Sequence, residues 1–277
     1  MDLPGKGSSA PLPEEKIMSD YETVKYKQHA AVALITLHRP DSMNAFNTAM
    51  RRDLTSALVR AASSASVRAV VLTGEGRSFS AGADLKDGLG NEQSIQQTLQ
   101  TEYRPALDCI ASMSQPVIAA VGGSAAGIGM SYALACDLLV MADNAFLLSP
   151  FSTISLVPDG GLNFMLVQQL GYKRAFQLSA EAERISAERC VELGLANRAV
   201  PAASLVDEAM KWAHSLAERA PLSLAATKKA MRHAASGSWA STFDVEASMQ
   251  DKLKLSQDCA EGVTAFFEKR KANFSGL

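Results

Sequence analysis

Short apolar runs alternate with amphipathic segments along the first part of the chain. The segment from Val24 to His38 is strand-like and contains the run AVALITL, which Pro40 stops. Asn47 then offers a helix N-cap. One helical face follows at spacings of three and four residues, formed by Met50, Leu54, Leu58 and Ala61. A strand followed by a capped helix is therefore predicted between residues 24 and 61.

The same alternation continues to about residue 142. Further strands are predicted at 67–72, 116–121 and 137–142. Helices are predicted at 99–113 and 130–135, a glycine-rich turn at 122–129, and a mobile loop in the polar stretch 86–97. Strands that alternate with helices indicate an α/β fold with substantial parallel pairing.

From Leu162 onward the pattern is almost entirely helical, and only 197–201 interrupts it as a short strand. Helices are predicted at 162–170, 172–179, 186–193, 204–219, 221–235, 240–256 and 260–270. The start of the chain is rich in Pro, Gly and Ser, and Met18 precedes the first strand-like pattern. We therefore divide the chain into a disordered leader or tag (1–17), an α/β core (18–200) and a helical C-terminal region (201–277).

Composition narrows the class of protein. The 277 residues are 47% hydrophobic and carry a net charge of -2, so a core can form and a nucleic-acid partner is not expected. The sequence contains no apolar run long enough to span a membrane, so no membrane partner is expected. The four cysteines are far apart and form no metal-binding pattern with the four histidines. Reduced thiols in a reducing compartment are predicted, which favours the cytoplasm.

Two glycine-containing segments, 78–85 and 121–129, each follow a predicted strand and place small residues where a helix should begin. Small residues let a ligand approach backbone N–H groups, which are unpaired at helix N-termini. Two such turns side by side can hold one oxyanion between two amides. The alternative is that they only make tight connections. The second segment lacks the spacing of a dinucleotide fingerprint and the GK[ST] of a phosphate loop.

Four motifs together resemble the enoyl-CoA hydratase/isomerase (crotonase) superfamily, and most closely its isomerase branch. They are HRPDSMNA at 38–45, SFSAGADL at 78–85, the glycine turn that leads to CDL at 136–138, and EGVTAFFEKRKANF at 261–274. The resemblance runs from about residue 20 to 275 in the family's order. It implies a spiral α/β core of repeated ββα units with a helical C-terminal trimerisation region. The expected assembly is a homotrimer or a dimer of trimers.

The resemblance also implies an acyl-CoA thioester substrate whose carbonyl oxygen accepts hydrogen bonds from two backbone amides. By motif these amides belong to Ala83 and Ile128, where isoleucine replaces the commoner glycine and is expected to narrow the pocket. No prosthetic group or metal is implied, since coenzyme A arrives as part of the substrate. The implied coenzyme A contacts are Asp41, Ser42, Met43, Ala81, Asp84, Leu85, Lys86, Phe266 and Lys269.

Alternatives remain for some of these contacts. Asp84 follows the first amide, and fixing the turn or capping a helix is a stronger role for it than catalysis. Phe266 and Lys269 belong to the same or an adjacent subunit. Lys269 also fits a solvated basic helix end.

The chain departs from the hydratases of this family at both of their catalytic glutamates. By motif, one position is Ser131 and the other is Phe151, and neither can move a proton at neutral pH. Hydration needs one group to activate water and another to protonate the α-carbon. The ordinary hydratase mechanism therefore lacks both of its acid–base groups in this sequence. Ser131 has no evident histidine partner, and its replacement by alanine is expected to do little.

Asp159, in the segment LVPDGG, is the one carboxylate left in a position that resembles the isomerase branch. A single base can remove a proton from one carbon of an enoyl chain and return it two carbons away. An apolar pocket would raise its pKa, and its predicted lining is Phe146, Leu148, Phe151, Ile154, Leu156 and Phe164. The alternative role for Asp159 is a helix N-cap. The alternative functions are a hydratase that works by a non-standard route and a non-catalytic acyl-CoA-binding paralogue.

Overall fold

The computed structural model describes residues 21–88 and 94–277. The predicted leader, including Met18, and the middle of the predicted 86–97 loop lie outside the described residues. The described parts of that loop are short helices, α2 (Leu85–Gly88) and the beginning of α3 (Ile95–Thr98).

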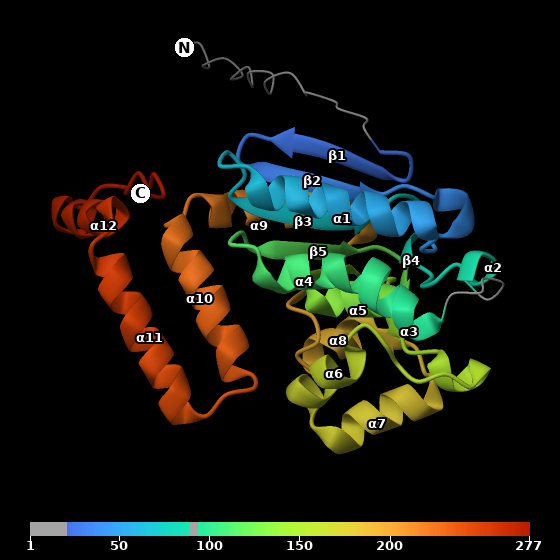
Figure 1. Cartoon of the computed structure of the whole chain (residues 1–277). Helices are drawn as coiled ribbons and strands as arrows, with labels where there is room; N and C mark the ends of the chain where they lie inside the picture. Colours follow the sequence, from blue (N-terminus) through green and yellow to red (C-terminus); the bar gives the residue numbers. More distant parts are fainter. Residues whose placement is uncertain (1–20, 89–93) are drawn as a thin grey trace, which may run out of the picture.

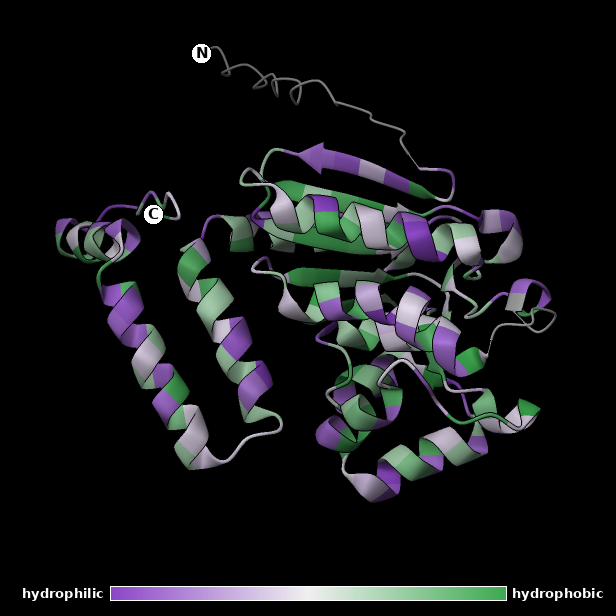
Figure 2. Cartoon of the chain, in the orientation of Figure 1, coloured by the Kyte–Doolittle hydropathy of each residue, from purple (hydrophilic) through white to green (hydrophobic). Residues whose placement is uncertain are grey.

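A six-stranded sheet forms the centre of the molecule, in the order β1-β2-β3-β5-β7-β10. Only the β1–β2 pair is antiparallel; the other neighbours are parallel. The strands are β1 (Val24–His29), β2 (Val32–Leu37), β3 (Ala69–Gly74), β5 (Val117–Val121), β7 (Leu138–Ala142) and β10 (Arg198–Val200). The apolar runs of β3 and β5 are almost wholly buried, as expected for central parallel strands covered on both faces. In Figure 2 these strands are green, whereas the edge strand β1 is mostly purple.

The segment predicted as one strand, 24–38, is in fact a hairpin. Ala30 adopts a left-handed φ of 50°, and the chain reverses there between β1 and β2. Neither Ala30 nor Ala31 is a typical turn residue, so the pattern concealed the turn. The strand prediction was right in type and wrong in the number of strands.

A second, four-stranded sheet lies beside the first, in the order β4-β6-β8-β9. Its strands are very short: β4 (Ser78–Ser80), β6 (Ser124–Ala126), β8 (Phe146–Leu148) and β9 (Ile185–Ser186). The first three pair in parallel and β9 pairs antiparallel with β8. The predicted glycine turn at 122–129 therefore contains a strand, and the helix after it begins at Ile128. This sheet positions the two glycine turns.

Helices cover both faces of the central sheet. The helix α1 (Thr48–Ser63) packs on β1 and β2, and Asn47 accepts a hydrogen bond from the Met50 N–H at 3.0 Å. The predicted face of α1 is buried, which confirms both the cap and the periodicity. The predicted helix 99–113 is a π-helical turn, η2 (Leu99–Tyr103), that continues into α4 (Arg104–Ser112). The helix α5 (Ile128–Ala135) is buried along its whole length.

The remaining elements follow the predicted pattern closely. The helices are α6 (Leu162–Leu170), α7 (Tyr172–Glu181), α8 (Ala187–Glu192), α9 (Leu205–Ala217), α10 (Pro221–Ala234), α11 (Trp239–Lys254) and α12 (Gln257–Glu268). Short 3-10 turns occur at η1 (Pro40–Ser42), η3 (Phe151–Ile154) and η4 (Ala202–Ser204).

The helical C-terminal part is not uniform. The helix α9 packs on the central strands β3 and β5, so it belongs to the sheet layers. The helices α10, α11 and α12 instead form an arm that extends from the sheet to one side of the molecule (Figure 1). A largely buried Lys228 side chain, 9% exposed, anchors α10, since its ammonium lies 2.8 Å from the Asp137 carboxylate. Within the described residues, no helix is long and apolar enough to cross a membrane.

The four cysteines are free thiols, of which Cys136 and Cys190 are buried and Cys109 and Cys259 half-buried. In the described parts of the chain, no three Asp, Glu, His or Cys side chains are grouped to hold a metal.

Candidate active site

The two glycine turns meet at the ends of paired strands. Because β4 and β6 run parallel, the chain leaves both at the same edge of the sheet. Gly82 and Gly127 have positive φ angles of 102° and 54°. A Cβ on Gly82 would lie 2.9 Å from the Ala126 carbonyl oxygen and 3.6 Å from the Gly127 Cα. Only glycine therefore allows the two turns to approach this closely.

The residue after each glycine carries one of the predicted amides. On either side of Ala83, the Phe46 N–H donates to the Gly82 carbonyl at 2.8 Å and the Asp84 N–H donates to the Phe46 carbonyl at 3.1 Å. Ile128 is the first residue of α5, where helical amides have no partner within the helix. Among the described residues, neither the Ala83 nor the Ile128 N–H donates to a protein acceptor. Both amides are therefore available to an oxyanion, and their distances from a thioester oxygen stay a prediction.

Buried polar groups hold the first turn. The Asn44 side chain donates to the Ser78 carbonyl at 2.7 Å, and the Ser80 hydroxyl donates to the Asn44 carbonyl at 2.8 Å. The Ser80 oxygen also accepts the Gly82 N–H at 3.1 Å. Asn44 was not predicted as a site residue, although its place in HRPDSMNA was a signal. These bonds fix the peptide that precedes Ala83.

The predicted coenzyme A contacts of the N-terminal half lie around this turn. Asp41 and Ser42 are exposed in η1, and the Ala81 N–H donates to the Met43 carbonyl at 2.9 Å, so the two segments touch. Leu85 and Lys86 are exposed at the start of α2. These residues form one accessible rim beside Ala83.

Asp84 is engaged within the protein. Its carboxylate lies 3.0 Å from the Arg39 guanidinium and also accepts the Lys86 N–H at 3.2 Å. This arrangement is the turn-fixing role that the sequence analysis left open for Asp84.

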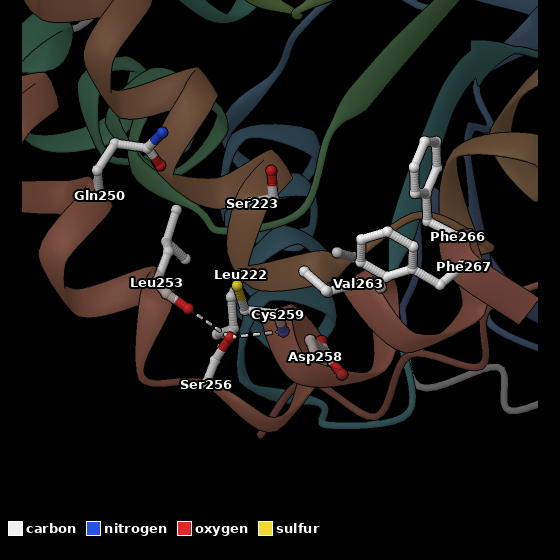
Figure 3. A pocket seen from close by; sticks show the side chains of 12 residues that line it. Leu222, Ser223, Gln250, Leu253, Ser256, Asp258, Cys259, Val263, Phe266 and Phe267 are labelled. Atoms are coloured by element: carbon white, nitrogen blue, oxygen red, sulfur yellow. Dashed lines mark hydrogen bonds between the residues drawn. The ribbon is translucent and has the colours of Figure 1, made fainter.

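The structure separates Phe266 and Lys269 from that rim. Both lie at the end of α12 in the arm, on the opposite side of the molecule from α2 (Figure 1). Phe266 is 78% exposed and lines a cavity of about 560 Å³ between α10, α11 and α12 (Figure 3). A larger cavity of about 1040 Å³ lies between α10, α11 and the end of α4. Neither cavity includes the glycine turns, so within one chain these two residues do not join the site.

Asp159 lies in the turn between η3 and α6, and one of its carboxylate oxygens, Oδ1, is buried without a hydrogen-bond partner among the described residues. Burial raises the pKa of its carboxyl to about 6, because a desolvated carboxylate is disfavoured. Burial and, less strongly, the Asp159 charge raise the pKa values of Tyr103 and Tyr132. The N-cap of α6 is Gly161, with no side-chain capping bond, so the capping alternative for Asp159 is wrong.

The Asp159 turn is in contact with the second glycine turn. The Ser131 hydroxyl donates to the Asp159 carbonyl at 2.9 Å. A Cβ on Gly160 would lie 2.3 Å from the Ile128 Cδ1 atom. Ile128 is only 3% exposed, so its side chain lies under the Asp159 turn. The Asp159 turn and the Ile128 amide thus share one helix, α5, as their support.

The predicted apolar lining is only partly in place. Phe151 is buried, and its ring lies 3.8 Å from where a Cβ on Gly127 would stand. Ile154, Leu156 and Phe164 are exposed, and the Arg184 guanidinium covers the Phe146 ring. Ile154, Leu156 and Phe164 are exposed because η3, α6 and the segment between them lie on the outside of the single chain.

An aromatic cluster around Tyr132 was not predicted from the sequence, and the Asp159 charge acts on both of its tyrosines. Phe46 stacks on Tyr132 with a centroid distance of 4.7 Å, and Tyr103 meets Phe46 edge-on at 6.3 Å. Its members are far apart in the chain, so no local pattern pointed to them.

Known proteins of one family match nearly the whole chain. The family described as "Enoyl-CoA hydratase/isomerase" matches residues 27–276. A "Probable enoyl-CoA hydratase" of Rhodobacter capsulatus is 41% identical over 256 residues, 92% of this chain and 99% of the relative. The "1,2-epoxyphenylacetyl-CoA isomerase" of Escherichia coli is 33% identical over 249 residues, 88% of this chain and 95% of the relative.

Solved structures agree with the sequence matches. An enoyl-CoA hydratase from Bacillus anthracis superimposes with a TM-score of 0.89 at 30% identity, covering 92% of this chain and 100% of that chain. The predicted α/β fold with a helical C-terminal region is thereby confirmed.

Proposed function

The chain belongs to the enoyl-CoA hydratase/isomerase family, and we propose that it moves the double bond of an enoyl-CoA thioester, with Asp159 as the single base. The observation that carries this proposal is the buried carboxylate oxygen of Asp159, which has no hydrogen-bond partner among the described residues. A pKa of about 6 leaves the group mostly ionised at neutral pH and still able to hold a proton briefly. Structural carboxylates are usually paired instead.

The reaction needs no water and no group other than these. The Ala83 and Ile128 amides hold the thioester oxygen as negative charge develops on it. The Asp159 carboxylate takes a proton from one carbon of the acyl chain, and the C–H electrons move into a conjugated enolate. The same carboxyl returns the proton two carbons away, so the double bond migrates and the base is regenerated. Coenzyme A is part of the substrate, and no prosthetic group takes part.

Hydration is the second candidate, and the name of the Rhodobacter relative favours it. At the two positions where family hydratases carry glutamate, this chain has Ser131 and Phe151, both buried. A hydratase would have to use Asp159 both to activate water and to protonate carbon. Water addition to a 2-enoyl-CoA by the wild-type protein would support this candidate.

Assay of 2-enoyl- and 3-enoyl-CoA substrates of several chain lengths tests the proposal, for both double-bond migration and water addition. The variant Asp159→Asn keeps the shape of the side chain but cannot take a proton, so it should abolish isomerisation and retain binding of acyl-CoA. Asp108→Asn is the matched control, because its carboxylate is exposed and pairs only with Arg104 in the described structure. Full isomerase activity in Asp159→Asn would refute the mechanism.

We also propose that the protein assembles through its arm as a trimer or a dimer of trimers, in the cytoplasm. The aromatic side chains of Trp239, Phe266 and Phe267 are largely exposed, and exposed apolar patches commonly mark interfaces. Phe266 and Lys269 would then contact the coenzyme A of an adjacent subunit. Sedimentation at micromolar concentration tests the assembly, and a monomer would refute it.

A further inference from the structure

We propose that Ser131 is a positioning residue that holds the Asp159 turn against α5, in the orientation that aims the carboxylate. This inference rests on the proposed function of Asp159 as base. Ser131 is fully buried, and its hydroxyl donates to the Asp159 backbone carbonyl at 2.9 Å, across 28 residues of sequence. The hydroxyl therefore acts on the backbone of the base and leaves the reacting carboxylate free.

Close packing reinforces that hydrogen bond. Gly160 has a φ of +62°, and a Cβ there would lie 2.3 Å from Ile128 Cδ1 and 2.9 Å from Ser131 Cβ. The Asp159–Gly160 peptide therefore rests directly on the first turn of α5. Since Ile128 also supplies an oxyanion amide, the base and that amide are held on one rigid element.

The carboxylate depends on its backbone for its orientation. Its Oδ1 atom has no hydrogen-bond partner in the described structure, so no side-chain contact there fixes it. On the side of α6, the Leu162 N–H reaches the Asp159 carbonyl at 3.1 Å and the Asn163 side chain reaches the Pro158 carbonyl at 2.7 Å. On the opposite side, the Ser131 hydroxyl makes the polar link to α5. Without it, polar links hold the turn from the α6 side only, and packing alone remains on the side of α5.

This role differs from the one expected from sequence. By motif, Ser131 occupies the place of a hydratase glutamate, and its replacement was expected to have little effect. The geometry instead points to Ser131 as a support for the Asp159 carboxylate, at a position where family hydratases carry a proton-transferring glutamate.

The test compares the kinetics of Ser131→Ala, Ser131→Thr and Thr73→Val on the preferred enoyl-CoA. Ser131→Ala should lower kcat by about 10- to 100-fold, because small displacements of a reacting group cost rate, and should leave KM within about threefold. Ser131→Thr keeps the hydroxyl and should restore most of kcat. Thr73→Val removes a comparable buried hydroxyl outside the site, one that donates to the Ala120 carbonyl at 2.9 Å. This variant should leave kcat unchanged.

The pH profile provides a readout that a purely structural role would not move. In the wild type, kcat should fall as pH drops through about 6, the pKa of Asp159. In Ser131→Ala the loosened turn lets water reach the Asp159 carboxylate, which lowers its pKa. The midpoint of the acid limb of the kcat profile should therefore move down by about one pH unit. An unchanged limb with a normal kcat would overturn the proposal, as would equal losses in Ser131→Ala and Thr73→Val.

Two further variants separate the possible failures. If Asp159→Asn is inactive while Ser131→Ala is fully active, only the positioning role is refuted. If Asp159→Asn is active, the proposed function itself fails. Should Ser131→Ala not fold, Ser131→Cys keeps the volume with a weak donor; a reduced kcat there supports the proposal, and a wild-type kcat refutes it.

Discussion

The two turns that carry Ala83 and Ile128 present similar amides but are held by different forces. The first turn is held by buried polar groups. Arg51 is 4% exposed, lies 2.7 Å from Glu102, and donates at 3.1 Å to the Phe46 carbonyl that also receives the Asp84 N–H. The second turn is held by packing, since every residue of α5 is buried.

This difference determines how each turn should fail. A polar network costs most when one partner is removed and the others remain buried and unpaired. A packed contact costs most when volume is added where no space exists. A substitution at Gly160 therefore tests the packing on Ile128, and one at Arg51 tests the polar network of the first turn.

The largest effect is expected for Gly160→Ala. The new Cβ would collide with Ile128 and occupy a positive φ, so the Asp159 turn must lift off α5. We expect kcat to fall by at least about 100-fold and the unfolding free energy by about 3 kcal/mol. Steady-state kinetics and urea denaturation measure the two quantities.

Gly161→Ala is the matched control. Gly161 also has a positive φ, of 79°, but no atom of the residues that the structure describes lies within 4 Å of where its Cβ would stand. Backbone strain alone should cost about 1 kcal/mol and leave kcat within a few-fold. Equal losses of kcat in the two variants would show that strain, and not packing on Ile128, controls the Asp159 turn.

A smaller effect on rate is expected for Arg51→Gln. This change leaves Glu102 without its guanidinium partner and the Phe46 carbonyl with the Asp84 N–H but without the Arg51 donor. Removing one partner of such a largely buried pair costs about 3 kcal/mol. The loosened Phe46 peptide should weaken the Ala83 amide and lower kcat by about 10-fold. Infrared spectra of a bound acyl-CoA measure this directly, because a weaker hydrogen bond returns the thioester carbonyl stretch towards its value in solution.

Arg52→Gln is the matched control, because it makes the same change of charge and side-chain length at the neighbouring residue. Arg52 is 64% exposed and pairs with Asp53, so its loss should cost less than about 1 kcal/mol and leave the carbonyl stretch unchanged. If Arg51→Gln leaves the stretch unchanged as well, the polar network supports the fold but not the first amide.

The smallest effect concerns stability against pH. Burial raises the pKa of Asp159 from 3.8 to about 6, so between these values the folded state holds a proton that the unfolded chain has lost. The unfolding free energy should therefore fall by about 2 kcal/mol as pH rises from about 4 to 7. Asp159→Asn lacks this contribution. Parallel denaturation curves of the two proteins over that range would contradict the buried carboxylate.

Local sequence determined the elements whose cause is local. The cap at Asn47 and the apolar face of α1 follow from neighbours three and four residues apart, and the structure confirms them. The hairpin at Ala30 was missed because no typical turn residue marks it. The strands of the second sheet were missed because two or three residues are too few to show a periodic pattern. The motifs also predicted the Ala83 and Ile128 amides and Asp159 as site residues, because small residues and a lone carboxylate can be recognised in the sequence itself.

Tertiary structure alone decided what those residues can do together. Gly82 meets Gly127, and Gly160 meets Ile128, across long stretches of chain that no local pattern connects. The raised pKa of Asp159 comes from burial by distant elements, and Ser131 has a role only because the Asp159 turn lies on it. The candidate chemical groups of this protein can therefore be recognised from local sequence. The orientation and the pKa of Asp159 instead arise from packing between residues far apart in sequence.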